Sequence, residues 1–168
     1  MTNPEVTIRK ATLDDCDGLE KLMWEFGEWS RENYFAPLGL RWNFEFDNEK
    51  SVIINDIKDF IEGEGKWTLI AIKNGKIVGF INAELGEDKN FKHKKYARLH
   101  NFFVTKSERG KGIGREMLWN KMNEDLAKME IDFLVLTTMV NNPVREFYEK
   151  EGFISESTKM VKKVVEIK

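Results

Sequence analysis

The stretch that decides the fold is Val104-Thr105-Lys106-Ser107-Glu108-Arg109-Gly110-Lys111-Gly112-Ile113-Gly114-Arg115. Apolar residues typical of a strand, Phe102 and Phe103, precede it, and helical periodicity begins at Ile113. A helix N-terminus carries unsatisfied N–H groups and a partial positive charge, so it attracts anions. The sequence therefore predicts a strand, an anion-binding turn and a helix in succession.

Glycine and basic residues suit this turn to phosphate. Gly110, Gly112 and Gly114 let the backbone approach a ligand where a Cβ atom would intrude. The basic side chains that add charge for phosphate contacts are Lys106, Arg109, Lys111 and Arg115. We therefore expect residues 109–115 to form a pyrophosphate site.

The spacing of the glycines excludes two common nucleotide sites. A Walker A loop has two glycines separated by four residues and followed by Lys-Ser or Lys-Thr, and this turn has neither feature. A dinucleotide fingerprint has Gly-x-Gly-x-x-Gly, whereas the order here is Gly-x-Gly-x-Gly. The turn does match Arg-x-x-Gly-x-Gly at Arg109, Gly112 and Gly114. Taken alone, it could also be an ordinary glycine-rich connection.

A second segment, residues 141–153, has the start and end signals of a short helix. Asn141 or Asn142 can cap its N-terminus, and Pro143 suits the first helical position. Gly152 suits the position after the last turn. The residues spaced to share one helix face are Val144, Phe147 and Tyr148.

Together the two segments resemble the motifs of the Gcn5-related N-acetyltransferase (GNAT) superfamily. The turn is similar to the Arg-x-x-Gly-x-Gly signature for acetyl-CoA, and the second segment is similar to Asn-x-x-Ala-x-x-x-Tyr followed by Gly-Phe. Asn141, Tyr148 and Gly152-Phe153 match this second motif, whereas Val144 stands where alanine is usual. The resemblance implies acetyl-CoA (coenzyme A) as cofactor. It also implies transfer of an acetyl group to a primary amine of a small molecule or of a protein or peptide.

The predicted elements have the order of a mixed α/β sandwich and are similar to the GNAT fold, a central, mostly antiparallel sheet flanked by helices. Strands are predicted at 6–11, 67–72, 76–85, 96–104 and 131–138, and a final strand or hairpin at 153–165. Helices are predicted at 13–31, 47–61, 114–128 and within the second motif. Asn74-Gly75 predicts a tight hairpin, and the β-branched residues of 131–138 predict a buried strand. The 168 residues suit a single domain, residues 1–168.

Composition narrows the class of function. Charged residues make up 33% of the chain and hydrophobic ones 41%, as in soluble globular proteins. A net charge of −2 gives no reason to expect nucleic acid as a partner. A single cysteine, Cys16, cannot form an internal disulfide, and there is no signal-like or membrane-spanning apolar stretch, so we expect a cytoplasmic protein without membrane contact. Two histidines and one cysteine offer no metal-ligand spacing, so no metal is expected.

The resemblance assigns the cofactor to three parts of the chain. Backbone groups of the strand before the turn would pair with the pantetheine arm and polarise the thioester carbonyl. The N–H groups of the turn would hold the pyrophosphate, and Asn141 would contact the cofactor arm unless it serves only as a helix cap. The expected cofactor-binding residues are Phe102, Phe103, Val104, Arg109, Gly110, Lys111, Gly112, Ile113, Gly114, Arg115 and Asn141.

Acetyl transfer to an amine needs a proton acceptor for the amine and a proton donor for the departing thiol. The resemblance gives the donor role to Tyr148, which could instead be buried only for packing. Some family members carry a glutamate where Arg98 stands here, so that carboxylate base is missing. His100 is the first candidate for the base, because histidine is the residue type that exchanges protons near neutral pH, and Glu84 in the neighbouring strand is the next candidate. His100 could equally be a structural residue, and a chain of waters could replace a single base.

Alternation along residues 96–104 predicts which side chains share a face of the sheet. One face would carry Arg98, His100, Phe102 and Val104, and the other Leu99, Asn101 and Phe103. The base candidate His100 would then lie on the same face as Phe102.

The acceptor and the partners stay open. Aromatic residues Trp24, Trp29, Tyr34, Phe35 and Trp42, beside Glu25, Glu28 and Glu32, could form a pocket for a cationic amine or could be core beside a solvated helix face. A basic run at 89–95 favours an anionic partner or is a solvated loop. The missing carboxylate at Arg98 motivates a non-catalytic acyl-CoA-binding module as the alternative function. A nucleic-acid-binding domain is disfavoured because its basic residues lie at the predicted turn, and the resemblance allows a homodimer.

Overall fold

The structure, a computed structural model, describes residues 6–37, 50–90, 92 and 94–157. The chain consists of two compact units, Met1–Thr137 and Thr138–Lys168. The strands of the first unit are β1 (Val6–Lys10), β2 (Lys66–Lys73), β3 (Lys76–Glu87), β4 (Lys95–Val104) and β5 (Phe133–Leu136). Its α-helices are α1 (Cys16–Ser30), α2 (Lys50–Glu62) and α3 (Asn120–Lys128), and the second unit has α4 (Arg145–Lys150). A single domain over residues 1–168 stays a prediction.

Short helical segments extend these elements. The 3-10 turn η1 (Leu13–Asp15) leads into α1, and the π-helical η2 (Arg31–Phe35) continues it. The 3-10 turn η4 (Lys106–Glu108) follows β4, and the π-helical η5 (Ile113–Trp119) leads into α3. The predicted helices at 13–31 and 114–128 are therefore confirmed, the first running on to residue 35.

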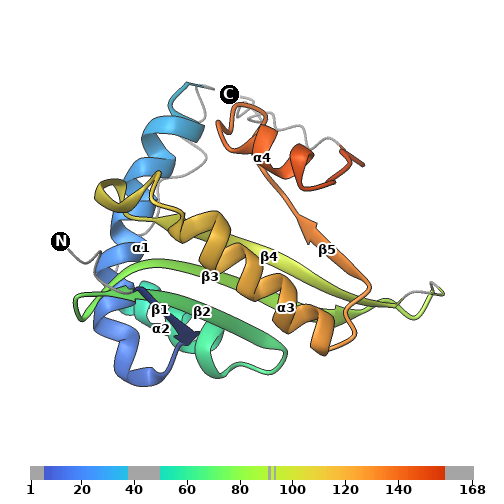
Figure 1. Ribbon diagram of the computed structural model, residues 1–168, viewed down its shortest axis with the longest axis horizontal. Coiled ribbons are helices and arrows are strands. Elements are labelled where there is room, and N and C mark those ends of the chain that lie inside the picture. The colour runs from blue at the N-terminus through green and yellow to red at the C-terminus, as the bar shows by residue number, and fades with distance from the viewer. Residues whose placement is uncertain (1–5, 38–49, 91, 93, 158–168) are drawn as a thin grey trace, which may run out of the picture. The chain divides into compact units, whose positions relative to one another are not determined.

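The five strands form one sheet in chain order, β1-β2-β3-β4-β5 (Figure 1). Neighbours are antiparallel from β1 to β4, and β4 and β5 are parallel. The predicted hairpin joins β2 to β3, with Asn74 at φ 52° and Gly75 at φ 71°, the left-handed values that a two-residue turn of this kind requires. The predicted mixed α/β fold with a mostly antiparallel sheet is confirmed.

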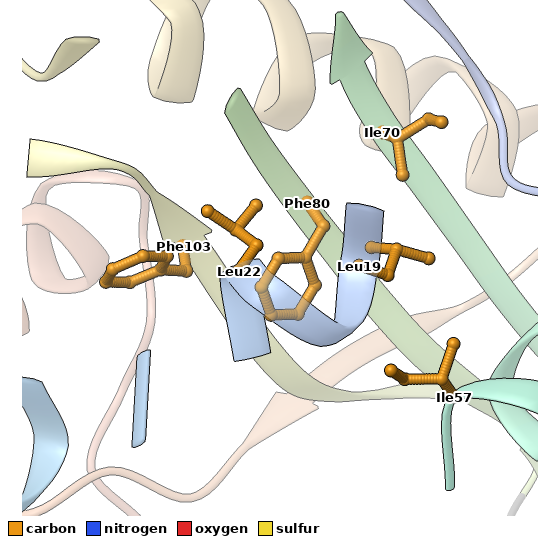
Figure 2. Packing of buried hydrophobic residues seen from close by; sticks show 6 residues of the cluster. All are labelled: Leu19, Leu22, Ile57, Ile70, Phe80 and Phe103. Carbon is orange, nitrogen blue, oxygen red and sulfur yellow. The ribbon is translucent and has the colours of Figure 1, made fainter. Parts of the chain in front are cut away.

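Each face of the sheet is covered by helices of the first unit. On one face Ile70, Phe80 and Phe103 lie opposite one another in register. They form a buried cluster with Leu19 and Leu22 of α1 and Ile57 of α2, as Figure 2 shows. On the other face Phe102 stacks on Trp119 of η5, with ring centroids 5.9 Å apart, and Figure 1 shows α3 crossing this side of the sheet. The sheet thus presents one face to α1 and α2 and the opposite face to η5 and α3.

One strand prediction was wrong in extent and burial. Residues 131–138 were expected to be a buried strand, but β5 covers only Phe133–Leu136, and Phe133 and Val135 are 54% and 39% exposed. The reason is its position, because β5 is last in the strand order and pairs with β4 over only four residues. Of the predicted terminal strand, residues 153–157 have no regular structure and the rest lies outside the described residues, as do residues 47–49 of the second predicted helix.

Candidate active site

The glycine-rich turn has the shape that its sequence predicts. Gly110 and Gly112 have φ values of 74° and 84°, in the left-handed region that glycine occupies without strain. A Cβ atom built on Gly110 would meet nothing within 4 Å, so the turn is open there, whereas one on Gly114 would lie 3.4 Å from the Phe102 ring. The third glycine therefore lets the following helix pack close to β4, and the first two shape an open turn at its N-terminus.

Arg109 holds this turn against β4 and α1. Its Nε donates a hydrogen bond to the carbonyl oxygen of Val104 at 2.9 Å. Its guanidinium lies 5.0 Å from the ring centroid of Trp29 and 4.9 Å from that of Phe103. Cation–π contacts of this kind favour a fixed side chain. The Arg109 side chain thus anchors the backbone of the turn, in addition to any charge that it contributes.

Two carboxylates fix the residues between β4 and the turn. Glu25 of α1 accepts hydrogen bonds from Thr105 Oγ1 at 2.7 and 2.9 Å and from the Lys106 N–H at 3.0 Å. Glu25 is therefore hydrogen-bonded to the residues that follow β4, and the amine pocket that it was expected to line stays a prediction. Glu108 lies 2.7 Å from Lys73 Nζ and 3.3 Å from Lys111 Nζ.

The two lysines also change the pKa of Glu108. The hydrogen bond from Lys73, followed by the contact with Lys111, holds the pKa of the Glu108 carboxyl below its usual value. Lys111, which belongs to the predicted pyrophosphate site, therefore forms an ion pair with Glu108 in this structure.

A β-bulge interrupts the pairing of β3 with β4 at His100. Asn82 is opposite Asn101 and Ala83 is opposite Leu99, so His100 is an extra residue on β4. A bulge of this kind shifts the alternation of side chains beyond it. The predicted alternation was therefore wrong, because Phe102 and Val104 face the η5 side, next to Gly114, whereas His100 turns toward α2.

The bulge brings His100 to the two residues that surround its ring. Its Nε2 lies 3.1 Å from Glu84 Oε2, and its ring centroid lies 5.1 Å from that of Phe60 on α2. Lys66 Nζ lies 3.1 Å from the same Glu84 oxygen and 5.2 Å from the Phe60 ring centroid. His100 and Glu84, the two base candidates from the sequence, are thus in direct contact, and Phe60 and Lys66 were not predicted.

The contact with Glu84 fixes which nitrogen of His100 can accept a proton. Hydrogen bonds from Lys66, then from His100, lower the pKa of the Glu84 carboxyl below its usual value, so it is ionised near neutral pH. An ionised carboxylate can only accept hydrogen bonds, so the facing Nε2 carries hydrogen. In the neutral ring the lone pair is then on Nδ1. The pair can therefore act as a base through Nδ1 of His100, with Glu84 orienting the ring.

The edge of β4 that faces away from β3 is paired with β5 over only part of its length. β5 pairs with β4 only as far as Leu99. At the far end the Thr105 N–H donates to the Val78 carbonyl of β3 at 2.9 Å, so alternate residues direct their main-chain groups toward β3. By this alternation Phe103 faces β3, and Phe102 and Val104 direct theirs to the other edge. Of the three residues whose main-chain groups were expected to bind the pantetheine arm, Phe102 and Val104 thus share that edge.

The second unit contains the other motif. Asn142 Oδ1 accepts a hydrogen bond from the Val144 N–H at 2.9 Å in the turn before α4, whose N-cap residue is Val144. Neither of the two asparagines predicted as N-cap occupies that position, because the helix begins later than predicted, at Arg145. Asn141 lies half-buried in the turn before Asn142. Gly152, at φ 92°, ends the helix as predicted, and the Phe153 N–H donates to the Tyr148 carbonyl at 3.0 Å.

Tyr148 is enclosed by aromatic rings of its own unit. Its ring centroid lies 5.5 Å from that of Phe147 and 5.7 Å from that of Phe153. Burial disfavours the charged phenolate and raises the pKa of Tyr148 to about 12. The phenol is thus protonated throughout the neutral range, which a proton donor requires.

Two features are absent from the part of the chain that the structure describes. None of the helices there is both long and apolar enough to cross a bilayer. The same residues include no group of three or more His, Cys, Asp and Glu side chains arranged to hold a metal ion.

Known proteins share this sequence pattern and architecture. Residues 18–153 match the model described as Acetyltransferase (GNAT) family. An uncharacterized N-acetyltransferase of Methanocaldococcus jannaschii is 28% identical over 149 residues, which are 88% of this chain and 60% of that relative. The chain therefore spans less than two thirds of the length of this curated relative.

Solved structures show the same fold at low identity. A mutant protein from Bacillus halodurans has a TM-score of 0.78 at 19% identity, over 95% of this chain and 99% of the other. AAC(6′)-Iy, in complex with the bisubstrate analogue CoA-S-monomethyl-acetylneamine, has a TM-score of 0.70 at 14% identity, over 96% of this chain and 99% of the other.

Proposed function

Because this chain belongs to the GNAT acetyltransferase family, as the match over residues 18–153 shows, we propose that it transfers an acetyl group from acetyl-CoA to a primary amine. The resemblance inferred from the two sequence motifs is thereby confirmed. The amine is part of a small molecule or of a protein or peptide. The observation that carries the proposal is the open glycine turn at the end of β4, the strand that also bears His100, whose ring contacts Glu84 of β3.

The residues of the turn suit coenzyme A. Left-handed Gly110 and Gly112 precede the N-terminus of the helix formed by η5 and α3, which offers N–H groups and positive charge to a pyrophosphate. The space beside Gly110 is open. The outer edge of β4, with the main-chain groups of Phe102 and Val104, suits the amides of a pantetheine arm. Support also comes from AAC(6′)-Iy, a protein of the same fold solved with a bisubstrate analogue that contains CoA.

The chemistry requires two proton movements on this chain. Acetyl-CoA supplies the thioester, and its reaction with an amine gives an amide and a free thiol. His100 Nδ1 takes the proton that the attacking amine loses, and Glu84 stabilises the imidazolium that results. Tyr148 donates its phenolic proton to the departing sulfur, a proton that it holds at neutral pH because its pKa is raised to about 12.

Thiol release from acetyl-CoA, measured with a panel of small and peptide amines, tests this function. We expect release that depends on at least one amine and that saturates with acetyl-CoA. Coenzyme binding without turnover on any amine would favour the alternative, a non-catalytic acyl-CoA-binding module. Absence of coenzyme binding would contradict both.

A further inference from the structure

Asn82 is a polar residue in the centre of β3 whose burial needs a reason. It is 4% exposed and follows Phe80 on the face that α1 and α2 cover. A small cavity on this face is lined by Asn82 together with apolar side chains of α1 and α2. A buried amide is unfavourable unless it is hydrogen-bonded, so its partners indicate what it does.

The side chain of Asn82 takes the place of a main-chain carbonyl in the sheet. Its Oδ1 accepts the Asn101 N–H at 2.9 Å and the Asn101 Nδ2 at 3.2 Å. The atom that faces the Asn101 N–H must be the amide oxygen, because a backbone N–H can only donate. In a regular antiparallel ladder a main-chain carbonyl of the neighbouring strand would fill this position.

This substitution occurs beside the bulge that carries His100. Asn82 is opposite Asn101, and the unmatched residue of β4 is the adjacent His100. With the side-chain oxygen holding the Asn101 N–H, the ladder stays bonded while β4 accommodates one extra residue. If β3 and β4 paired without the bulge, alternation would place His100 on the face of Phe102, away from Glu84.

We propose that Asn82 is a positioning residue for the base, whose amide oxygen sets the β4 bulge and so turns His100 toward Glu84. The effect on catalysis rests on the proposed acetyl transfer. The effect on the place of the His100 ring does not, so the two can be tested separately.

Three variants separate the hydrogen bond from general packing. Asn82→Leu keeps the branching at Cγ and removes the acceptor, and Asn82→Ala removes the acceptor with a smaller side chain should the leucine variant not fold. Asn82→Asp retains an acceptor oxygen. The matched control is Asn101→Ala, which loses the 3.2 Å side-chain bond and keeps the 2.9 Å backbone donor.

Histidine NMR reads the position of His100 directly. The chain has two histidines, so His100→Gln assigns their ring signals. In the parent protein, with the rings 5.1 Å apart, we expect nuclear Overhauser contacts between His100 and Phe60. These contacts should vanish in Asn82→Leu or Asn82→Ala and persist in Asn82→Asp and Asn101→Ala. Contacts that persist in a folded variant without the acceptor, or that vanish in Asn82→Asp, would overturn the proposal whether or not the protein transfers acetyl groups.

Kinetics then test the catalytic consequence. Asn82→Leu should lower kcat by roughly the factor seen for His100→Gln, on the order of 100-fold, with little change in the KM for acetyl-CoA. Adding Asn82→Leu to His100→Gln should cost nothing more, because the two changes remove one function. Additive losses would instead mean that Asn82 acts only through stability and would contradict the positioning role.

Discussion

Glu84 Oε2 on β3 lies 3.1 Å from His100 Nε2 on β4, across the bulge between the two strands. The same oxygen is 3.1 Å from Lys66 Nζ on β2. Three adjacent strands thus contribute to one polar cluster on the face that α2 covers, beneath the ring of Phe60. In the proposed acetyl transfer this cluster supplies the base, although Arg98 stands where some relatives have a glutamate.

The first prediction concerns the pair itself. His100→Gln should lower kcat by roughly 100-fold or more, within the usual range for loss of a general base. Glu84→Gln should lower it less, by about 10-fold, because the ring keeps its lone pair and loses only its orienting carboxylate. Steady-state rates with one amine and saturating acetyl-CoA measure both effects.

A carboxylate elsewhere on the same strand provides the control for this pair. Glu87→Gln, at the exposed end of β3, removes the same charge away from His100 and should leave kcat unchanged. Equal losses in Glu87→Gln and Glu84→Gln would mean that net charge, rather than contact with His100, matters.

The second prediction concerns Tyr148 and its pH dependence. Tyr148→Phe should lower turnover by roughly 10–1000-fold near neutral pH if the phenol donates its proton. A donor is active below its pKa and is lost as the pH rises through it. Because the pKa of Tyr148 is raised to about 12, the phenol keeps its proton and the activity of the parent protein should not fall on this account up to about pH 10. An undiminished turnover in Tyr148→Phe would reject the donor role.

The third prediction concerns the glycine turn. Gly112→Asp should abolish measurable coenzyme binding, because it strains a left-handed position and places negative charge where phosphate is expected. Titration calorimetry with coenzyme A measures the affinity. Gly75→Asp makes the same substitution at a similar φ in the β2–β3 hairpin and should bind coenzyme normally. Retained affinity in Gly112→Asp would mean that the turn does not hold the cofactor.

The fourth prediction concerns stability and acid. Asp15 is buried, lies 2.7 and 2.8 Å from the Arg9 guanidinium, and accepts the Thr12 N–H at 2.8 Å. These contacts, with Arg9 the strongest, hold the pKa of Asp15 below its usual value. Asp15→Asn should lower the free energy of unfolding by roughly 1–3 kcal/mol at pH 7.

The pH dependence gives this stability prediction its sign. A carboxylate with a lowered pKa stabilises the folded state above its unfolded-state pKa, and the contribution disappears as the pH falls through the folded-state value. The gap between parent and Asp15→Asn should therefore be constant above about pH 5 and close in acid, as urea denaturation at several pH values would show. A gap that widens in acid would contradict the assignment.

Sequence patterns sufficed where the determinant is local. Asn74-Gly75, the glycines of the turn and Gly152 set backbone conformations that depend on their own residues, and all three turns have the predicted form. The alternation of β4 failed because a bulge depends on the partner strand, here on the Asn82 side chain. The exposure of β5 likewise depends on its place at the end of the strand order, which cannot be read from its β-branched residues.

The contact of Lys66 with Glu84 is a part of the polar cluster that the sequence does not predict. Counting back from the two-residue hairpin turn would place Lys66 opposite Ala83, on the wrong face for Glu84. A register shift between Ala71 and Ile72 moves it opposite Glu84. The contact between Lys66 and Glu84 thus depends on one irregularity, which no residue of the strand signals.

The most direct measurement follows an acetyl group from donor to product. Acetyl-CoA labelled with deuterium in its acetyl group is incubated with the protein and an acceptor amine, and the amide product and the free thiol are quantified by mass spectrometry. We predict labelled amide in amounts equal to the thiol released, and none with a variant combining His100→Gln and Tyr148→Phe. Label that remains on coenzyme A with every amine tested, while the coenzyme binds, would contradict acetyl transfer.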